Sequence, residues 1–315
     1  MIVLTGGKTG GHIMPLIALA KKLDSVCYVG AYGSLEERLC QKHHIPFKGM
    51  HLKNNHLIPI IRCSTKLKLK KVKAIIATGG YISFPVLLYG IFHQIPIYLL
   101  EENVIMGRTN RFFAKFAKRV FLTFPLPKMK KKYEVVGLPT LTKELSFQKY
   151  GFLSIDVLII GGSLGSKPLC DLAELLKKNY RVCLIAGRYY NDYKDISNLL
   201  VFDYIDDLPN LMLQSKLIIS RSGASTSYEI FSLGKPCIQI PSSNTSQNHQ
   251  YLNALYFEKY GCCKLLKETE AKKNIEQLVS YYFENAESRK NMIESQQEFV
   301  FQNSCEKIVE WVKQK

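Results

Sequence analysis

Short apolar runs alternate with amphipathic stretches along this chain. Ile2–Leu4 and Asp156–Ile160 have the length and composition of buried strands, and each leads into a glycine-rich loop. Behind each loop, apolar residues recur three and four positions apart, which predicts a helix with one face in a core. Strands that alternate with helices in this way predict an α/β fold with parallel sheets and right-handed crossovers.

This strand–loop–helix unit occurs twice, with glycine loops that start at Gly6 and Gly161. A chain of 315 residues is long enough for two domains, which we expect at residues 1–139 and 140–315. The pattern leaves open that the last helix packs back on the first domain. Ligands of such sheets bind at the carboxyl ends of the strands. Further strands are predicted at residues 25–29, 74–77, 95–100, 120–123, 182–186, 201–204, 217–219 and 237–240.

A third loop, Ser220–Glu229, consists mainly of small polar residues and follows the apolar run Leu217–Ile219. It leads into the apolar face of a predicted helix at Ile230 and Phe231. The start of a helix carries unpaired N–H groups and a partial positive charge, so it suits an anionic or hydroxyl-rich ligand. For this stretch alone, an ordinary capped helix with a solvated Glu229 is an equally good interpretation.

The net charge of +17 indicates an anionic partner: a nucleic acid, a membrane surface or a substrate. No nucleic-acid-binding motif accompanies the charge, so we expect no nucleic acid as partner. The apolar segment 57–61 precedes a lysine cluster, a combination that predicts contact with an anionic membrane. A core helix with a solvated basic face is the alternative. The cluster consists of Lys66, Lys68, Lys70, Lys71 and Lys73.

Cysteine usage and the apolar segments point to a reducing compartment and no membrane span. The nine cysteines are scattered and include no Cys-x-x-Cys pair, as expected for buried thiols in a cytosol. The first residues run directly into a strand, which argues against a signal peptide. The apolar segment 81–100 is interrupted by Pro85, Gly90 and Pro96, so it predicts a buried helix and strand.

Several separated motifs together resemble the MurG family, whose members add N-acetylglucosamine (GlcNAc) from UDP-GlcNAc to lipid I and so make lipid II. The resemblance spans almost the whole chain, and the order of the motifs makes it specific. They are Gly6–Ile13, Gly79–Tyr81, Glu101–Asn103 with Gly107 and Asn110, Gly161–Ser163, Arg221–Thr226 with Glu229, and His249–Gln250 with Asn253–Ala254.

The resemblance implies a GT-B glycosyltransferase, with two Rossmann-like domains whose parallel sheets face each other across a cleft. The first domain would bind acceptor and membrane, and the second would bind UDP-GlcNAc. It also implies a peripheral location on the cytoplasmic face of the cell membrane and inversion at the anomeric carbon, with no metal and no cofactor. The sequence contains no Asp-x-Asp motif, the usual means of holding a divalent ion on a diphosphate.

The resemblance also assigns roles to individual residues. It implies that Ile205 meets the uracil through its backbone and that Glu229 accepts hydrogen bonds from the ribose hydroxyls. Gln250 is expected at the GlcNAc hydroxyls and Ser163 beside the phosphates. The other residues expected to approach the donor are Thr9, Gly10, Gly11, Asn103, Ala224, Ser225, Thr226, Ser227 and Tyr228.

Two residues are candidates for the catalytic base. His12 follows the first glycine loop, and the ordinary pKa of histidine suits proton transfer near neutral pH. A loop histidine that only caps the helix is the structural alternative. Glu101 is the competing candidate.

The chain departs from the family pattern at several positions. Leu141 stands where a nucleotide-contacting arginine is usual, which weakens the expected hold on the donor. Leu164 replaces a usual Gln, Lys8 a glycine, Leu100 a His and Glu102 a Gln. Two alternatives therefore remain: a GT-B enzyme with another lipid acceptor, such as a diacylglycerol glycosyltransferase, and a UDP-GlcNAc 2-epimerase.

Overall fold

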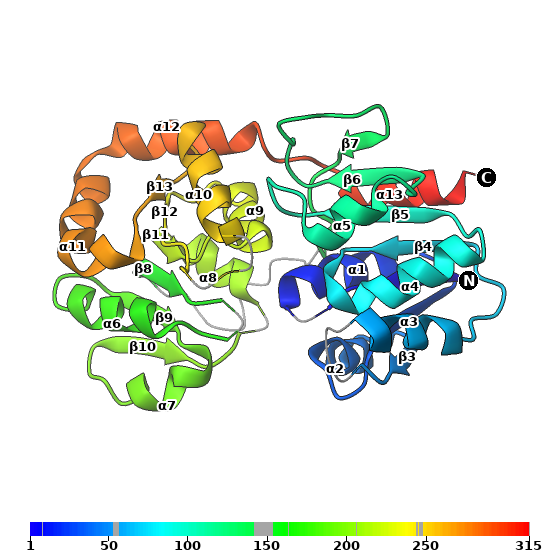
Figure 1. The fold of residues 1–315 in the computed structure, drawn as a ribbon. Helices are drawn as coiled ribbons and strands as arrows, with labels where there is room; N and C mark the ends of the chain where they lie inside the picture. Colours follow the sequence, from blue (N-terminus) through cyan, green and yellow to red (C-terminus); the bar gives the residue numbers. More distant parts are fainter. Residues whose placement is uncertain are drawn as a thin grey trace. The chain divides into compact units, whose positions relative to one another are not determined.

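The computed structural model describes residues 1–7, 9–52, 57–141, 154–162, 164–205, 207–243, 245 and 248–314, with only the backbone of 57–60. The chain divides into two compact units. Unit 1 comprises Met1–Thr142 and Phe301–Lys315, and unit 2 comprises Lys143–Val300. Each unit is an α/β domain built on a parallel sheet, which confirms the predicted fold class (Figure 1).

The sheet of unit 1 has the strand order β3-β2-β1-β4-β5-β6-β7, with every pair parallel. Its strands are β1 (Ile2–Thr5), β2 (Val26–Ala31), β3 (Phe47–Met50), β4 (Ala74–Ala77), β5 (Ile97–Glu101), β6 (Arg119–Leu122) and β7 (Tyr133–Val135). Its helices are α1 (Gly10–Ala20), α2 (Leu35–Lys42), α3 (Leu57–Lys66), α4 (Gly80–Phe92), α5 (Arg108–Phe113) and α13 (Ser304–Lys313).

Both faces of this sheet are covered, which explains its continuous apolar strands. Successive residues of a strand point to opposite faces. Val3 accordingly packs in a core cluster with residues of α4, whereas Leu4 packs in a second cluster with residues of α1 and α13. A strand buried on both faces must be apolar at every position, as Ala74–Ala77 is.

Helix α13 returns to unit 1 from the far end of unit 2 in the sequence (Figure 1, red). Its Ile308 is fully buried in the same cluster as Leu4 and Ile17. The Arg119 guanidinium stacks 3.6 Å from the centre of the Trp311 ring, and the hydroxyl of Tyr98 donates a hydrogen bond to the Trp311 carbonyl over 3.3 Å. The helix is therefore part of the core of unit 1.

The sheet of unit 2 has the order β10-β9-β8-β11-β12-β13, again with parallel pairs. Its strands are β8 (Ile155–Ile160), β9 (Val182–Ile185), β10 (Leu199–Phe202), β11 (Ser215–Ser220), β12 (Cys237–Gln239) and β13 (Lys264–Leu265). Its helices are α6 (Lys167–Leu176), the 3-10 turn η1 (Gly187–Tyr189), α7 (Tyr190–Tyr193), α8 (Leu208–Gln214), α9 (Ala224–Ser232), α10 (His249–Lys259), α11 (Glu268–Glu284) and α12 (Ala286–Gln297).

Each sheet has one point at which the strand order reverses. β1 lies between β2 and β4, and β8 lies between β9 and β11. The connections on either side of such a strand run in opposite directions, which leaves a crevice at its carboxyl end where α/β proteins bind ligands. The glycine loops that start at Gly6 and Gly161 follow these two strands.

Candidate functional site

The loop after β1 admits no side chain at its first two positions. A Cβ atom on Gly6 would lie 1.9 Å from the hydroxyl of Thr78, and one on Gly7 would lie 2.7 Å from Ile82. The Thr78 hydroxyl donates a hydrogen bond to the backbone carbonyl of His12 over 2.8 Å. The loop is thus packed against the end of β4, and this packing fixes the first turn of α1.

His12 lies in that first turn and faces a carboxylate from the end of β5. Its Nδ1 is 3.5 Å from Oε1 of Glu102, and the two side chains are 29% and 4% exposed. Burial opposes a charge on the imidazole, but the carboxylates of Glu102 and, to a smaller extent, Glu101 together outweigh it. The pKa of His12 is therefore raised above its ordinary value of 6.5.

Glu101 is buried beside this pair and holds the loop that follows β5. One of its carboxylate oxygens accepts hydrogen bonds from the backbone and side chain of Asn103, at 3.0 and 3.2 Å. The other accepts from the Gly107 N–H and from Asn110, both at 2.9 Å. Burial raises the pKa of Glu101, although these bonds oppose the rise. The geometry gives Glu101 a structural function, and its predicted catalytic function stays a prediction.

The remaining candidates of unit 1 gather at the same edge of the sheet. Thr9 is exposed and precedes the first residue of α1, while Gly10 and Gly11 form its half-buried first turn. Asn103 is half-buried and tied to Glu101. The structure therefore brings all the predicted residues of this unit to the carboxyl ends of β1 and β5.

In unit 2 the loop after β8 is equally tight. Gly165 has a φ of +74°, and a Cβ atom on it would lie 2.0 Å from the Ala186 carbonyl oxygen. A Cβ atom on Gly161 would lie 2.6 Å from the backbone nitrogen of Ser166. Ser163, the residue predicted beside the phosphates, lies outside the described residues.

Arg221 joins this loop to the one that follows β11. Its guanidinium donates to the Ser166 hydroxyl over 2.6 Å and to the Ile240 carbonyl over 3.0 Å. It also forms an ion pair with Glu268, and its side chain is only 11% exposed. The two loops on either side of the switch between β8 and β11 are therefore held together by one buried cation.

Helix α9 begins at Ala224, after Gly223, and no side chain caps its N-terminus. Ser225, Thr226 and Glu229 are half-buried. Ser227 is fully buried, where its hydroxyl donates to the Gly223 carbonyl and accepts from Gln239. Tyr228 and Ala224 are buried as well. The first turn thus presents backbone N–H groups, whereas the Ser227 and Tyr228 side chains face the core.

The other two predicted donor residues lie in neighbouring segments. Ile205 is buried and follows β10. The side-chain oxygen of Gln250 accepts a hydrogen bond from the Ser242 N–H over 2.9 Å, and its backbone carbonyl accepts from the Ser222 hydroxyl over 2.8 Å. Asn253 in turn donates to the Ser222 carbonyl over 3.2 Å. Gln250 is therefore anchored to the loop after β11.

Two contacts of these networks had not been predicted from the sequence: the approach of Glu102 to His12, and the ion pair between Arg221 and Glu268. Each pair joins residues far apart in the chain. Glu102 and Arg221 lie within motifs found in the sequence, but a motif does not give the partner of a side chain.

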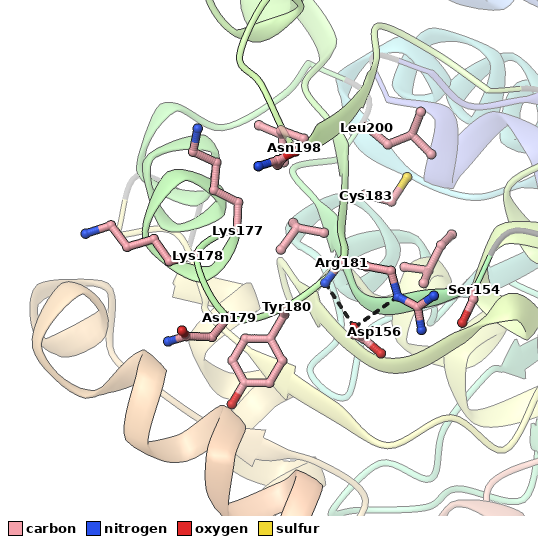
Figure 2. A pocket seen from close by; sticks show the side chains of 13 residues that line it. Ser154, Asp156, Lys177, Lys178, Asn179, Tyr180, Arg181, Cys183, Asn198 and Leu200 are labelled. Atoms are coloured by element: carbon pink, nitrogen blue, oxygen red, sulfur yellow. Dashed lines mark hydrogen bonds and ion pairs between the residues drawn. The ribbon is translucent and has the colours of Figure 1, made fainter.

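A hollow of about 670 Å³ in unit 2 lies at the amino ends of the strands, opposite the carboxyl ends where the candidate site lies (Figure 2). It is lined by residues that begin β8, β9 and β10, including Ile155, Val182 and Leu199. Arg181 and Asp156 form an ion pair there, 3.4 Å apart (Figure 2). None of the predicted donor residues lines this hollow, so it is separate from the candidate site.

Comparison with known proteins gives matches over nearly the whole chain. Residues 2–122 match the N-terminal domain model of glycosyltransferase family 28, and residues 156–308 match its C-terminal domain model. Two curated proteins that match are named UDP-N-acetylglucosamine–N-acetylmuramyl-(pentapeptide) pyrophosphoryl-undecaprenol N-acetylglucosamine transferase. The protein from Sulfurihydrogenibium sp. is 29% identical over 98% of this chain and 96% of its own length. The protein from Bacillus pumilus is 30% identical over 85% of this chain and 86% of its own length.

Two solved structures are similar in fold. MurG from Acinetobacter baumannii aligns with a TM-score of 0.81 and 24% identity, covering 100% of this chain and 99% of its own. The UDP-GlcNAc 2-epimerase from Neisseria meningitidis aligns with a TM-score of 0.67 and 20% identity, covering 100% of both chains.

Proposed function

The chain belongs to the MurG family of glycosyltransferases, and we propose that it transfers GlcNAc from UDP-GlcNAc to the MurNAc 4-hydroxyl of lipid I, forming lipid II. The observation that carries this proposal is the sequence match across both units with relatives that bear the name of this activity. Each glycine loop of the match also stands at the point where its sheet reverses strand order.

Unit 2 is suited to hold the donor. The uncapped start of α9 offers N–H groups and a partial positive charge to the diphosphate. Glu229, about one turn further along, can accept two ribose hydroxyls at once. Gln250 would contact the sugar, and Ile205 the uracil. The same helix start stabilises the negative charge that develops on UDP as it departs.

The reaction needs a base and a nucleophile. The 4-hydroxyl oxygen of MurNAc bonds to the anomeric carbon of GlcNAc from the face opposite UDP. The bond between that carbon and the UDP oxygen breaks, and its electron pair leaves with UDP. The hydroxyl proton passes to His12, the base of this proposal. The configuration at the anomeric carbon is thereby inverted.

An anionic membrane surface is the proposed location, at the cytoplasmic face. Among the helices of the described residues, none is long and apolar enough to cross a bilayer. The lysine cluster is exposed in the structure, as is Ile61 of α3. Phe92, Phe112 and Phe116 expose large apolar rings on the same unit. Lysines beside exposed apolar side chains suit binding to anionic lipid.

The proposed function is tested by incubating the protein in detergent with lipid I and UDP-GlcNAc labelled in the sugar. We expect equal amounts of labelled lipid II and UDP. Transfer to diacylglycerol but not to lipid I would replace the proposal by a different lipid glycosyltransferase. Conversion of UDP-GlcNAc without acceptor would replace it by a 2-epimerase, whose likeness to this chain is one of fold.

The membrane proposal is tested by replacing Lys66, Lys68, Lys70 and Lys71 with Gln. Each lysine near an anionic surface contributes about 1 kcal/mol, so binding to phosphatidylserine vesicles should fall by roughly two to three orders of magnitude. Raising the salt should weaken wild-type binding and leave the variant little changed. The matched control replaces four exposed lysines of unit 2, Lys178, Lys259, Lys273 and Lys290. Equal losses in both variants would show that total charge, and not this surface, binds the membrane.

A further inference from the structure

We propose that Glu102 is a positioning residue, which holds the imidazole of His12 through Nδ1 and so makes Nε2 the nitrogen that accepts the proton of the acceptor hydroxyl. The proposal rests on the proposed function, because it deepens the part given there to His12. Its geometric core is independent of that function.

The pair is fixed from both sides. Glu102 directly follows β5, and its side chain is 4% exposed. His12 is held by its backbone, whose carbonyl accepts the hydrogen bond from Thr78 at the end of β4. The imidazole thus has Nδ1 within ion-pair distance of a buried carboxylate oxygen, 3.5 Å away, while 29% of the side chain remains exposed. A proton that this carboxylate keeps on Nδ1 leaves the lone pair of the neutral ring on Nε2.

The charges around the ring single out Glu102. Two carboxyl groups face the imidazole from the end of β5, those of Glu102 and Glu101. Both carboxylate oxygens of Glu101 already accept hydrogen bonds, which come from Asn103, Gly107 and Asn110. Helix α1 has no acidic residue in its first turn, and its positive N-terminal end disfavours a charged imidazole. From β4, Thr78 contributes a hydroxyl without charge.

The charge of Glu102 can be separated from its shape, because Gln has the same shape and no charge. A Gln at this position could still accept a hydrogen bond from Nδ1, but it would stabilise a charged imidazole less than a carboxylate does. Glu102 therefore sets both the orientation and the proton affinity of His12, and the two effects can be separated by substitution.

The first measurement is an NMR titration of the seven histidine side chains, with the His12 signal identified by its loss in His12→Gln. We expect the midpoint of His12 to lie above 6.5 in the wild type and to fall in Glu102→Gln. The control is Glu306→Gln, which removes the same charge from an exposed ion pair with Lys22 in the same unit. An unchanged His12 midpoint in Glu102→Gln would overturn the proposal.

The second measurement is the pH profile of lipid II formation. In Glu102→Gln the acidic limb of kcat/KM should move to lower pH, with most of the plateau rate retained. In Glu102→Met, which has no acceptor for Nδ1, kcat should fall at least about tenfold while the KM for UDP-GlcNAc changes less than about twofold. A Glu102→Met plateau equal to that of the wild type would overturn the positioning role.

The two proposals fail separately. If the wild type forms lipid II but the titration midpoint of His12 is the same in the wild type and in Glu102→Gln, the positioning role is wrong and the proposed function is supported. A Glu102-dependent midpoint in a protein that makes no lipid II would support the pair and remove the function.

Discussion

The loops at the two switch points have the same topology and opposite chemistry. Both follow a central strand, β1 or β8, and both are packed so tightly that glycine is needed for close approach. In unit 1 the site gathers three titratable side chains, His12, Glu101 and Glu102. In unit 2 it gathers hydroxyls, amides and backbone N–H groups around Arg221, whose charge is paired with Glu268, and Glu229 lies in the same helix, α9.

Under the proposed function, this difference divides two tasks between the units. Holding a diphosphate and a sugar requires donors in fixed positions, and neutral groups supply them without a pH-dependent charge. Moving a proton requires a group whose pKa lies near the working pH, and neighbouring carboxylates adjust it. Unit 1 is therefore expected to control rate, and unit 2 to control donor affinity.

The largest expected effect comes from removing the base. His12→Gln should lower kcat by about 10²- to 10⁴-fold, because general base catalysis contributes that much. The KM for UDP-GlcNAc should change less than about threefold if the base acts on the acceptor alone. Steady-state kinetics with lipid I checks this, and a rise in KM without loss of kcat would break the contrast between the units.

Glu229→Ala should mainly weaken donor binding, whereas His12→Gln should mainly lower kcat. The loss of charge-assisted hydrogen bonds to the ribose costs about 1.5–3 kcal/mol, so the Kd for UDP should rise by roughly tenfold to 150-fold. Calorimetric titration with UDP and with 2′- and 3′-deoxy-UDP provides the control. The deoxy analogues should bind more weakly than UDP to the wild type and about equally to the variant. The same preference for UDP in both proteins would remove the ribose contact.

Arg221→Met should destabilise unit 2 by about 1–3 kcal/mol, because it leaves buried acceptors on Ser166, Ile240 and Glu268 without their partner. The single tryptophan, Trp311, lies on α13 and reports unit 1. Urea unfolding should therefore shift in far-UV circular dichroism but not in tryptophan fluorescence.

The control for this variant is Arg181→Met, which breaks an ion pair whose arginine is 64% exposed. Such exposed pairs contribute about 1 kcal/mol or less, so the control should change little. Equal losses in both variants would show that Arg221 is no more than a surface charge.

The smallest expected effect is on the pH dependence of stability. The folded pKa of His12 is raised above its ordinary value, so its stabilisation of unit 1 is complete below the unfolded pKa. It is lost as the pH rises through the folded pKa. Relative to His12→Gln, the wild type should be more stable at a pH of about 5.5 than at about 8.5 by Trp311 fluorescence. If the stability difference between the wild type and His12→Gln were the same at both pH values, His12 would gain no stabilising charge interaction with Glu102.

Much of the fold was predictable because buried parallel strands have a strong signature. The apolar runs before Gly6 and Gly161 mark β1 and β8, and the buried helix and strand expected in the apolar segment 81–100 correspond to α4 and β5. The edge strands were harder. β3 contains Lys48 and Gly49, β13 has two residues, and β10 lies two residues before its predicted position, at Leu199–Phe202. Edge strands bury less surface and so carry a weaker apolar pattern.

The candidate site could be predicted from the sequence as a set of loops, but the contacts between its side chains could not. The ion pair between His12 and Glu102 joins residues 90 positions apart, and the bond from Arg221 to Ser166 spans 55. No local pattern encodes such pairs. For Ser227 and Tyr228 a signal existed, because they lie four and three positions, respectively, before the buried Phe231 on one side of a helix.

The return of α13 to unit 1 has a consequence for the order in which a nascent chain can fold. The ribosome adds residues from the amino end, so Ile308 emerges after all of unit 2 although it belongs to the core around Leu4. Unit 2 is continuous in sequence and can bury its own apolar side chains first. Unit 1, begun earliest, keeps an uncovered apolar strip until the last helix arrives and is completed last.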